Sequence, residues 1–124
     1  MTKQFGIQIL LDDQAAKALR KGLRADEGRL RTIARVRPVG MSEPVLATQL
    51  LIPESAEGSL SNTAIKDYEL AWRAVEAGAW DTGRLILDKL PEKDGPSNFL
   101  RKLLSRFNDE APPTWDGAIR LSEK

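Results

Sequence analysis

Three arginines, Arg31, Arg35 and Arg37, are the residues of this sequence whose type and spacing best suit phosphate contacts. Guanidinium groups bind phosphate oxygens, and residues an even number apart on a strand point to one side. We therefore expect the three to project from one face as weak candidate phosphate contacts. However, Asp26 and Glu27 lie close by in the sequence, and no aromatic ring lies among the arginines to stack on bases. A solvated face of mixed charge is the simpler interpretation, and nucleic acid is not the expected partner.

Other catalytic chemistry has few candidates in this sequence. It contains no histidine and no cysteine, so imidazole bases, thiolate nucleophiles and the commonest metal ligands are missing. The adjacent carboxylates Asp12 with Asp13, and Asp109 with Glu110, point in different directions and lack the further oxygen ligands of a calcium loop. Ser42 has no histidine to act as its base. We expect no catalytic, cofactor-binding or metal-binding residue in this chain.

The composition is that of an ordinary globular domain. The chain has 124 residues, of which 41% are hydrophobic and 30% charged, and its formal net charge is +1. Such a balance provides no strong field to attract nucleic acid or acidic lipid. The apolar run at residues 5–11 is short and ends in two aspartates, and no stretch has the length of a membrane helix. We expect a cytoplasmic protein without a membrane segment.

The first half of the sequence predicts a strand, a helix and two further strands. Residues 5–11 are apolar and β-branched, which favours a strand, and Asp12 is a suitable N-cap for a helix over residues 13–21. The segments 30–37 and 44–52 indicate two strands that pair as a hairpin. Strict alternation along the first of these places Leu30, Thr32, Ala34 and Val36 on one face and Arg31, Ile33, Arg35 and Arg37 on the other.

The second half predicts three short amphipathic helices, because apolar residues recur at helical spacing in three successive segments. Asp81 is the expected N-cap of the second helix and Pro91 its end, and Pro96 suits the first turn of the third. The stretch 94–97, Asp-Gly-Pro-Ser, lacks the lysine and glycine spacing of a phosphate loop and is better explained as a helix start. The apolar positions are Tyr68, Ala71, Trp72 and Val75, then Gly83, Ile86, Leu87 and Leu90, then Leu100, Leu103, Leu104 and Phe107.

These elements together predict an α+β fold. We expect residues 1–53 to form a small β-α-β-β sheet unit, 54–62 a linker, and 63–124 a helical tail with a terminal extended segment. The rhythm of large and small residues in the tail is similar to a tetratricopeptide repeat (TPR), but it covers barely one repeat. Because one repeat cannot bury its own face, we expect a three-helix, TPR-like tail packed on the sheet. The helices or another chain would also cover the open edges of this small sheet.

Aromatic residues of the tail are candidates for structural or interface roles. Trp115 follows two prolines near the C-terminus, where an exposed indole would be unfavourable. We expect Trp115 to lie in a folded tail, with Asp116 and Gly117 forming a turn and the next residues adding an extended edge. Trp72 and Trp80 are candidates of the same kind. The alternative role for Trp115 is that of an anchor in an interface with a partner.

Two stretches of the sequence resemble class III adenylate and guanylate cyclases. The first comprises residues 2–6, Thr-Lys-Gln-Phe-Gly, with Val39, Gly40, Glu43, Pro44 and Val45, and is similar to the closing part of the catalytic domain. The second is similar to the helical tail that follows this domain in many bacterial adenylate cyclases. Its matching residues are Asp94 to Ser97, Trp115 to Gly117 in a P-P-x-W-D-G motif, and Glu123 with Lys124. The resemblance spans nearly the whole chain, and the terminal motif is its more specific part.

The resemblance implies an adenylate-cyclase-like signalling protein whose parent converts ATP to cyclic AMP and diphosphate with Mg²⁺ or Mn²⁺. In the family, the metal-binding aspartates, the base-selecting residues and the transition-state asparagine and arginine precede the segment that matches residues 2–6. Val39 and Met41 stand where the family usually has lysines that meet the triphosphate. We therefore expect this chain alone to be inactive and to have a structural, dimerisation or regulatory role. The expected partner is the remainder of a cyclase domain or a second copy, as in a homodimer.

Two alternatives remain open from the residues. The first is an independent helical module for protein–protein interaction, in which the tail helices bind a partner. The second is a phosphate or nucleic-acid binder that uses Arg31, Arg35 and Arg37. A native product of this length would favour the module, and salt-sensitive retention on DNA would favour the binder.

Overall fold

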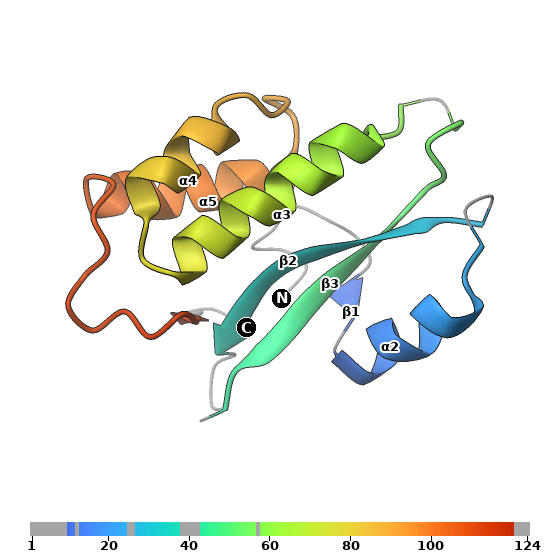
Figure 1. Cartoon of the computed structure of the whole chain (residues 1–124), viewed down its shortest axis with the longest axis horizontal. Helices are drawn as coiled ribbons and strands as arrows, with labels where there is room; N and C mark the ends of the chain where they lie inside the picture. The colour runs from blue at the N-terminus through green and yellow to red at the C-terminus, as the bar shows by residue number, and fades with distance from the viewer. Residues whose placement is uncertain (1–9, 12, 25–26, 38–42, 57, 121–124) are drawn as a thin grey trace.

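The fold is α+β, as the sequence predicts, and Figure 1 shows its arrangement. The computed structural model describes residues 10–11, 13–24, 27–37, 43–56 and 58–120. The predicted strand at residues 5–11 and the predicted N-cap Asp12 therefore lie largely outside the described residues. The elements are β1 (Leu10–Leu11), α2 (Asp13–Gly22), β2 (Arg29–Arg37), β3 (Val45–Leu51), α3 (Asn62–Glu76), α4 (Trp80–Leu87), α5 (Gly95–Arg106) and β4 (Ile119–Arg120).

The strands form one mixed sheet in the order β1-β3-β2-β4. The predicted hairpin is confirmed, because β2 and β3 pair in antiparallel register from Arg29 opposite Leu51 to Val36 opposite Val45. β1 pairs antiparallel with β3 on the other side. β4 pairs parallel with β2 at Val36 and Arg37, so the chain end returns to the sheet and adds the expected extended edge. Residues 38–42, which include the hairpin loop and Ser42, lie outside the described residues.

A β-bulge in β2 makes the predicted strict alternation wrong. Thr32 pairs with Thr48, but the next partnered residue is Ala34, which pairs with Ala47. Residues directly opposite in an antiparallel pair point to the same side, and neighbours along β3 point to opposite sides. Thr32 and Ala34 therefore lie on opposite faces, with Ile33 as the additional residue of the bulge. As a result, Arg31 shares a face with Ala34 and Val36, whereas Arg35 and Arg37 lie on the other face.

The helices lie on two sides of the sheet. Figure 1 shows α2 beside β1 and β3, well separated from α3, α4 and α5, which lie together on the other side. Helix α3 runs along β2, where its side chains also satisfy backbone groups at the bulge. The Tyr68 hydroxyl donates to the Ile33 carbonyl oxygen at 2.7 Å, and Glu69 Oε2 accepts from the Thr32 amide at 2.8 Å. These contacts cover backbone that would otherwise be an exposed sheet edge.

The helix starts follow local capping rules, with one correction. Asp94 caps α5 by accepting from the Ser97 amide at 3.2 Å, so the interpretation of residues 94–97 as a helix start is confirmed. Helix α4 begins at Trp80, with Ala79 as its N-cap, so the prediction of Asp81 as N-cap is wrong. The reason is tertiary, because Trp80 is 1% exposed and its Nε1 donates to the Val75 carbonyl oxygen at 2.9 Å. Because the Trp80 indole is buried, the helix begins at Trp80 and not after Asp81.

The core lies between the sheet and the three tail helices. The core residues come from β2, β3 and β4 and from each of the three helices α3, α4 and α5. The tail therefore shares its core with the sheet and does not form a separate unit. Among the described residues, no helix is both long and apolar enough to cross a bilayer. The buried core residues are Ile33, Ala34, Val36, Ala47, Tyr68, Ala71, Trp72, Val75, Trp80, Leu87, Leu90, Leu100, Leu103, Leu104 and Ile119.

Gly83 determines how closely α4 approaches α3. A Cβ at this position would lie 2.9 Å from Val75 Cγ2 and 3.4 Å from the Ala71 carbonyl oxygen. We expect Gly83→Val to lower the free energy of unfolding by about 1–3 kcal/mol, because the added methyl groups overpack this contact. Chemical denaturation measures the change. Gly22→Ala is the matched control, because a Cβ there meets nothing within 4 Å, and equal losses in the two variants would contradict this account.

Candidate functional site

Two of the three tryptophans meet where the chain end crosses the helices. Trp80 and Trp115 contact edge to face, with ring centroids 5.1 Å apart and an interplanar angle of 81°. Phe107, just beyond α5, makes a similar contact with Trp80 at 5.7 Å and 72°. Such T-shaped arrangements are favourable for aromatic pairs. Trp72 is also buried, in α3, but its ring makes neither of these contacts.

Both indole groups of this cluster bind the end of α3. Trp80 Nε1 donates to the Val75 carbonyl oxygen at 2.9 Å, and Trp115 Nε1 donates to the Glu76 carbonyl oxygen at 3.1 Å. The last carbonyl groups of a helix lack partners within the helix. The bond from Trp115 supplies a partner for the Glu76 carbonyl, whereas the Val75 carbonyl oxygen also accepts from the Gly78 amide at 3.0 Å. Trp115 is half-buried and packs against the core, so its ring belongs to the folded tail.

The turn at Asp116 and Gly117 directs the chain from Trp115 back to the sheet. Asp116 Oδ1 accepts from the Ala118 amide at 3.2 Å, and Oδ2 accepts from Arg37 Nη2 at 2.9 Å. The hydrogen bond from Arg37, helped by that from the Ala118 amide, lowers the pKa of the Asp116 carboxyl below its ordinary value. Gly117 has φ +89°, a conformation that favours glycine. The turn therefore aligns β4 with β2.

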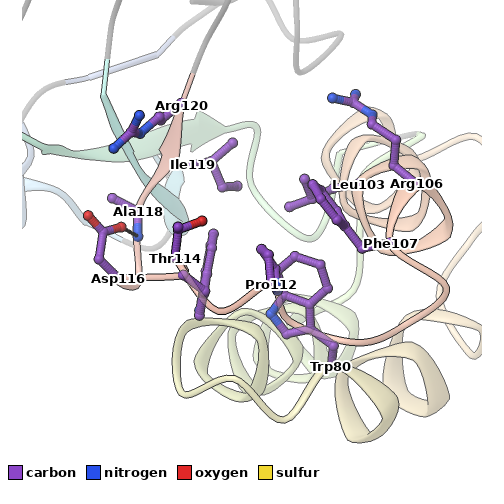
Figure 2. A pocket seen from close by; sticks show the side chains of 11 residues that line it. Trp80, Leu103, Arg106, Phe107, Pro112, Thr114, Asp116, Ala118, Ile119 and Arg120 are labelled. Atoms are coloured by element: carbon purple, nitrogen blue, oxygen red, sulfur yellow. Dashed lines mark hydrogen bonds between the residues drawn. The ribbon is translucent and has the colours of Figure 1, made fainter.

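A cavity of about 250 Å³ opens beside this aromatic cluster. Figure 2 shows its lining from α4, from the end of α5 and from the segment that leads into β4. The apolar part of the lining includes Trp80, Leu103, Phe107, Trp115 and Ile119. Two cationic side chains, Arg106 and Arg120, also line the cavity and are exposed. We take this aromatic cavity as the candidate functional site.

The structure does not bring the three candidate phosphate-binding arginines together on one surface. Arg31 is buried and paired with Asp94, Arg35 lies 3.5 Å from Glu76, and Arg37 lies 2.9 Å from Asp116. The bulge places Arg31 on the opposite face from the other two, so the expectation of a common face is wrong. Each guanidinium group has a carboxylate partner of its own. Arg31, Arg35 and Arg37 therefore act as links between the sheet and the tail.

The Arg31–Asp94 pair is a bidentate ion pair inside the protein. Arg31 Nη1 and Nη2 donate to the two carboxylate oxygens of Asp94, both at 2.9 Å. Gln49 Oε1 accepts from Arg31 Nε at 3.0 Å, and the guanidinium carbon lies 4.7 Å from the centre of the Tyr68 ring. Burial raises the pKa of the Tyr68 phenol well above its ordinary value, so this hydroxyl remains a donor. Sequence spacing provides no signal for a pair 63 residues apart.

The carboxylates considered for a metal have other roles where the structure describes them. Asp109 Oδ1 accepts from Arg84 Nη2 at 3.0 Å, which connects the end of α5 to α4. Asp12 lies outside the described residues. Within the described ranges, no group of three or more Asp or Glu side chains is close enough to hold a metal ion.

Comparisons of the chain with protein-family models, with curated proteins and with solved structures found no match.

Proposed function

We propose that this chain is the non-catalytic C-terminal segment of an adenylate-cyclase-like signalling protein, with a structural, dimerisation or regulatory role. The proposal rests on the resemblance to class III cyclases of residues 2–6 and 39–45, and on that of the tail at residues 94–97 and 115–117. The parent protein would convert ATP to cyclic AMP in the cytoplasm. Its metal ions and catalytic residues would lie in the part that precedes residues 2–6.

One observation supports this proposal most directly. The buried Arg31–Asp94 ion pair joins the two parts of the resemblance, because Arg31 lies on a strand of the cyclase-like part and Asp94 begins the tail motif at residues 94–97. Desolvating two charges is favourable only where both have good partners. We infer that the tail packs against the last strands of the parent domain and stabilises them.

The tail helices also support a finer proposal, that α3 and α4 form a TPR-like hairpin. Gly83 of α4 packs against Ala71 and Val75 of α3, which is the interlocking of small and large residues that such hairpins use. A single hairpin needs a further surface to bury its open face. Residues of α5 and the sheet share a core with α3 and α4, which supports this proposal.

In the proposed parent, the tail would stabilise the cyclase domain or its dimer. Class III active sites form between two such domains, as the resemblance implies, so the position of these strands would affect activity indirectly. The proposed partners are the remainder of the cyclase domain and a second copy of the same protein.

The proposal predicts that the chain alone produces no cyclic AMP from ATP with Mn²⁺. A polypeptide that joins it to the sequence encoded immediately upstream is expected to produce cyclic AMP, because the acidic ligands for two metal ions would then be present. Chromatographic detection of cyclic AMP measures both activities. Turnover by the chain alone, or an inactive longer polypeptide without two such aspartates, would contradict the proposal.

An independent interaction module is the second candidate function, and exposed leucines on the tail favour it. Leu70 of α3 is 52% exposed and Leu85 of α4 is 69% exposed, so a partner of the helices could cover both side chains. The two candidates differ in the size of the native product. An antibody against the tail would detect only a much larger polypeptide under the first proposal and one of this length under the second.

A further inference from the structure

We propose that the aromatic cavity beside Trp80 and Trp115 binds a small aromatic anion, a compound of one or two fused rings that carries a carboxylate or a similar acid group. This proposal does not depend on the cyclase proposal, because it uses only the cavity and its lining. Ligand binding would be a third role of the aromatic cluster, in addition to the burial of Trp80 and the hydrogen bonds to the end of α3.

The apolar lining of the cavity suits a flat ring. The N–H groups of Trp80 and Trp115 are both used in bonds to carbonyl oxygens of α3, so these indoles offer only apolar ring surface. Phe107 is 40% exposed and Trp115 is half-buried, so both retain ring area that a ligand could cover. Aromatic rings favour edge-to-face and offset contacts with one another. A third ring would extend the arrangement already present between Trp80 and its two neighbours.

The size of the cavity limits the ligand. Its volume of about 250 Å³ is below the range of about 300–1,000 Å³ that is typical for drug-sized ligands. The cavity therefore suits a compound of one or two rings, and a whole nucleotide would exceed it.

The charges around the cavity favour an anion. Arg106 and Arg120 line it, and neither forms an ion pair with any of the described residues. Among the described residues, the only carboxylate of the lining is that of Asp116, which is bound to Arg37 and to the Ala118 amide. Figure 2 shows Arg106 beside the space between Leu103 and Ile119, and Arg120 on the other side of β4 from the Ile119 side chain. An acid group at the rim beside Arg106 would gain charge-assisted hydrogen bonds, and Arg120 would add a second positive charge nearby, whereas a cation would be repelled.

Exposed arginines are common, and a simpler role exists for each. Arg106 lies in the last turn of α5, where a cation complements the helix dipole. Arg120 is an exposed residue of the short strand β4. Both cations line the same apolar cavity, and this combination is the one that an anionic ring compound would need.

The test compares two probes that differ in charge. We expect 2-naphthoate to bind saturably and to shift the indole N–H signals of Trp80 and Trp115 in ¹H–¹⁵N NMR spectra, while the Trp72 signal stays in place. The neutral 2-naphthamide is expected to bind about tenfold more weakly, because it lacks the charge-assisted contacts. Equal affinity for the two probes, equal shifts at Trp72, or no saturable binding of 2-naphthoate would overturn the proposal.

Variants separate the contribution of charge to the affinity for the probes from the contribution of apolar contacts. Arg106→Gln and Arg120→Gln together are expected to reduce the affinity for 2-naphthoate to that for 2-naphthamide, with an unchanged melting temperature. Lys102→Gln is the matched control, since Lys102 is an exposed cation of α5 outside the lining and its loss is expected to leave binding unchanged. Phe107→Ala is expected to weaken both probes equally. A similar loss in Lys102→Gln and in the arginine variants would mean that overall charge, not the cavity, attracts the anion.

Discussion

Asp94→Ala is expected to lower the free energy of unfolding by about 3–5 kcal/mol, because it leaves a buried charge without its partner. The Arg31 side chain is 1% exposed and that of Asp94 is 10% exposed, so the pair is largely shielded from water. The substitution also removes the cap of α5, since Asp94 accepts from the Ser97 amide and hydroxyl. Urea unfolding monitored by circular dichroism measures the change.

Two further variants test the cause of this loss. Arg31→Met combined with Asp94→Asn is expected to restore much of the stability, because it removes the unpaired charge and retains a capping side chain. Arg35→Gln is the exposed control, since the Arg35 and Glu76 side chains are 41% and 38% exposed. Solvent screening limits the expected loss there to at most about 1 kcal/mol. A loss in Asp94→Ala no larger than in Arg35→Gln would show that the buried pair is not a principal support of the fold.

The same pair predicts a dependence of stability on pH. Burial alone would raise the pKa of the Asp94 carboxyl, but the hydrogen bond and charge of Arg31, together with the bonds from Ser97, outweigh it and hold this pKa below its ordinary value. The pair therefore contributes fully above the ordinary aspartate pKa of about 3.9, and its contribution is lost as the pH falls through the lowered folded value. The free energy of unfolding of the unmodified chain, measured from pH 7 to pH 3 relative to that of the Arg31→Met, Asp94→Asn double variant, is expected to decrease below about pH 4.

Trp80→Ala is expected to have a comparable effect, a loss of about 3–5 kcal/mol. Trp80 is 1% exposed, contacts both Trp115 and Phe107 with its ring, and bonds the end of α3 through Nε1. Its removal leaves a large cavity where α4, α5 and the chain end meet. Thermal unfolding measures this loss, and Trp80→Phe is expected to recover part of it by filling some of the volume.

A double-mutant cycle with Trp115→Ala tests whether the two rings act together. We expect a coupling energy of about 0.5–1.5 kcal/mol between Trp80 and Trp115, as for other edge-to-face pairs. Trp72→Phe is a suitable comparison in the cycle with Trp80, because the two rings form no pair among the described contacts. Strict additivity of Trp80→Ala and Trp115→Ala would contradict the role of this contact in holding the chain end.

Local patterns in the sequence were sufficient for most of the elements. The spacing of Tyr68, Ala71, Trp72 and Val75 predicts the buried face of α3, and all four residues are buried. The hairpin and the start of α5 at residues 94–97 were predictable for the same reason. Helical periodicity, turn residues and caps act over a few positions, so the sequence contains the information directly.

The bulge and the start of α4 were not predictable in this way. One additional residue at Ile33 reverses the faces of every later residue of β2, yet nothing in an alternating pattern indicates where a bulge occurs. At α4, the burial of Trp80 prevails over the capping preference of Asp81. Both outcomes depend on how the strand and the helices pack.

The sequence by itself therefore determined the class of the fold, its helices and the aromatic residues of the tail. The tertiary structure decided which charges meet. Arg31 and Asp94 are 63 positions apart, and Arg37 and Asp116 are 79 apart. It also decided that Arg106 and Arg120 flank one cavity. The physical reason is that capping and periodicity are local, whereas the pairing of charges requires the sheet and the tail to be packed together first.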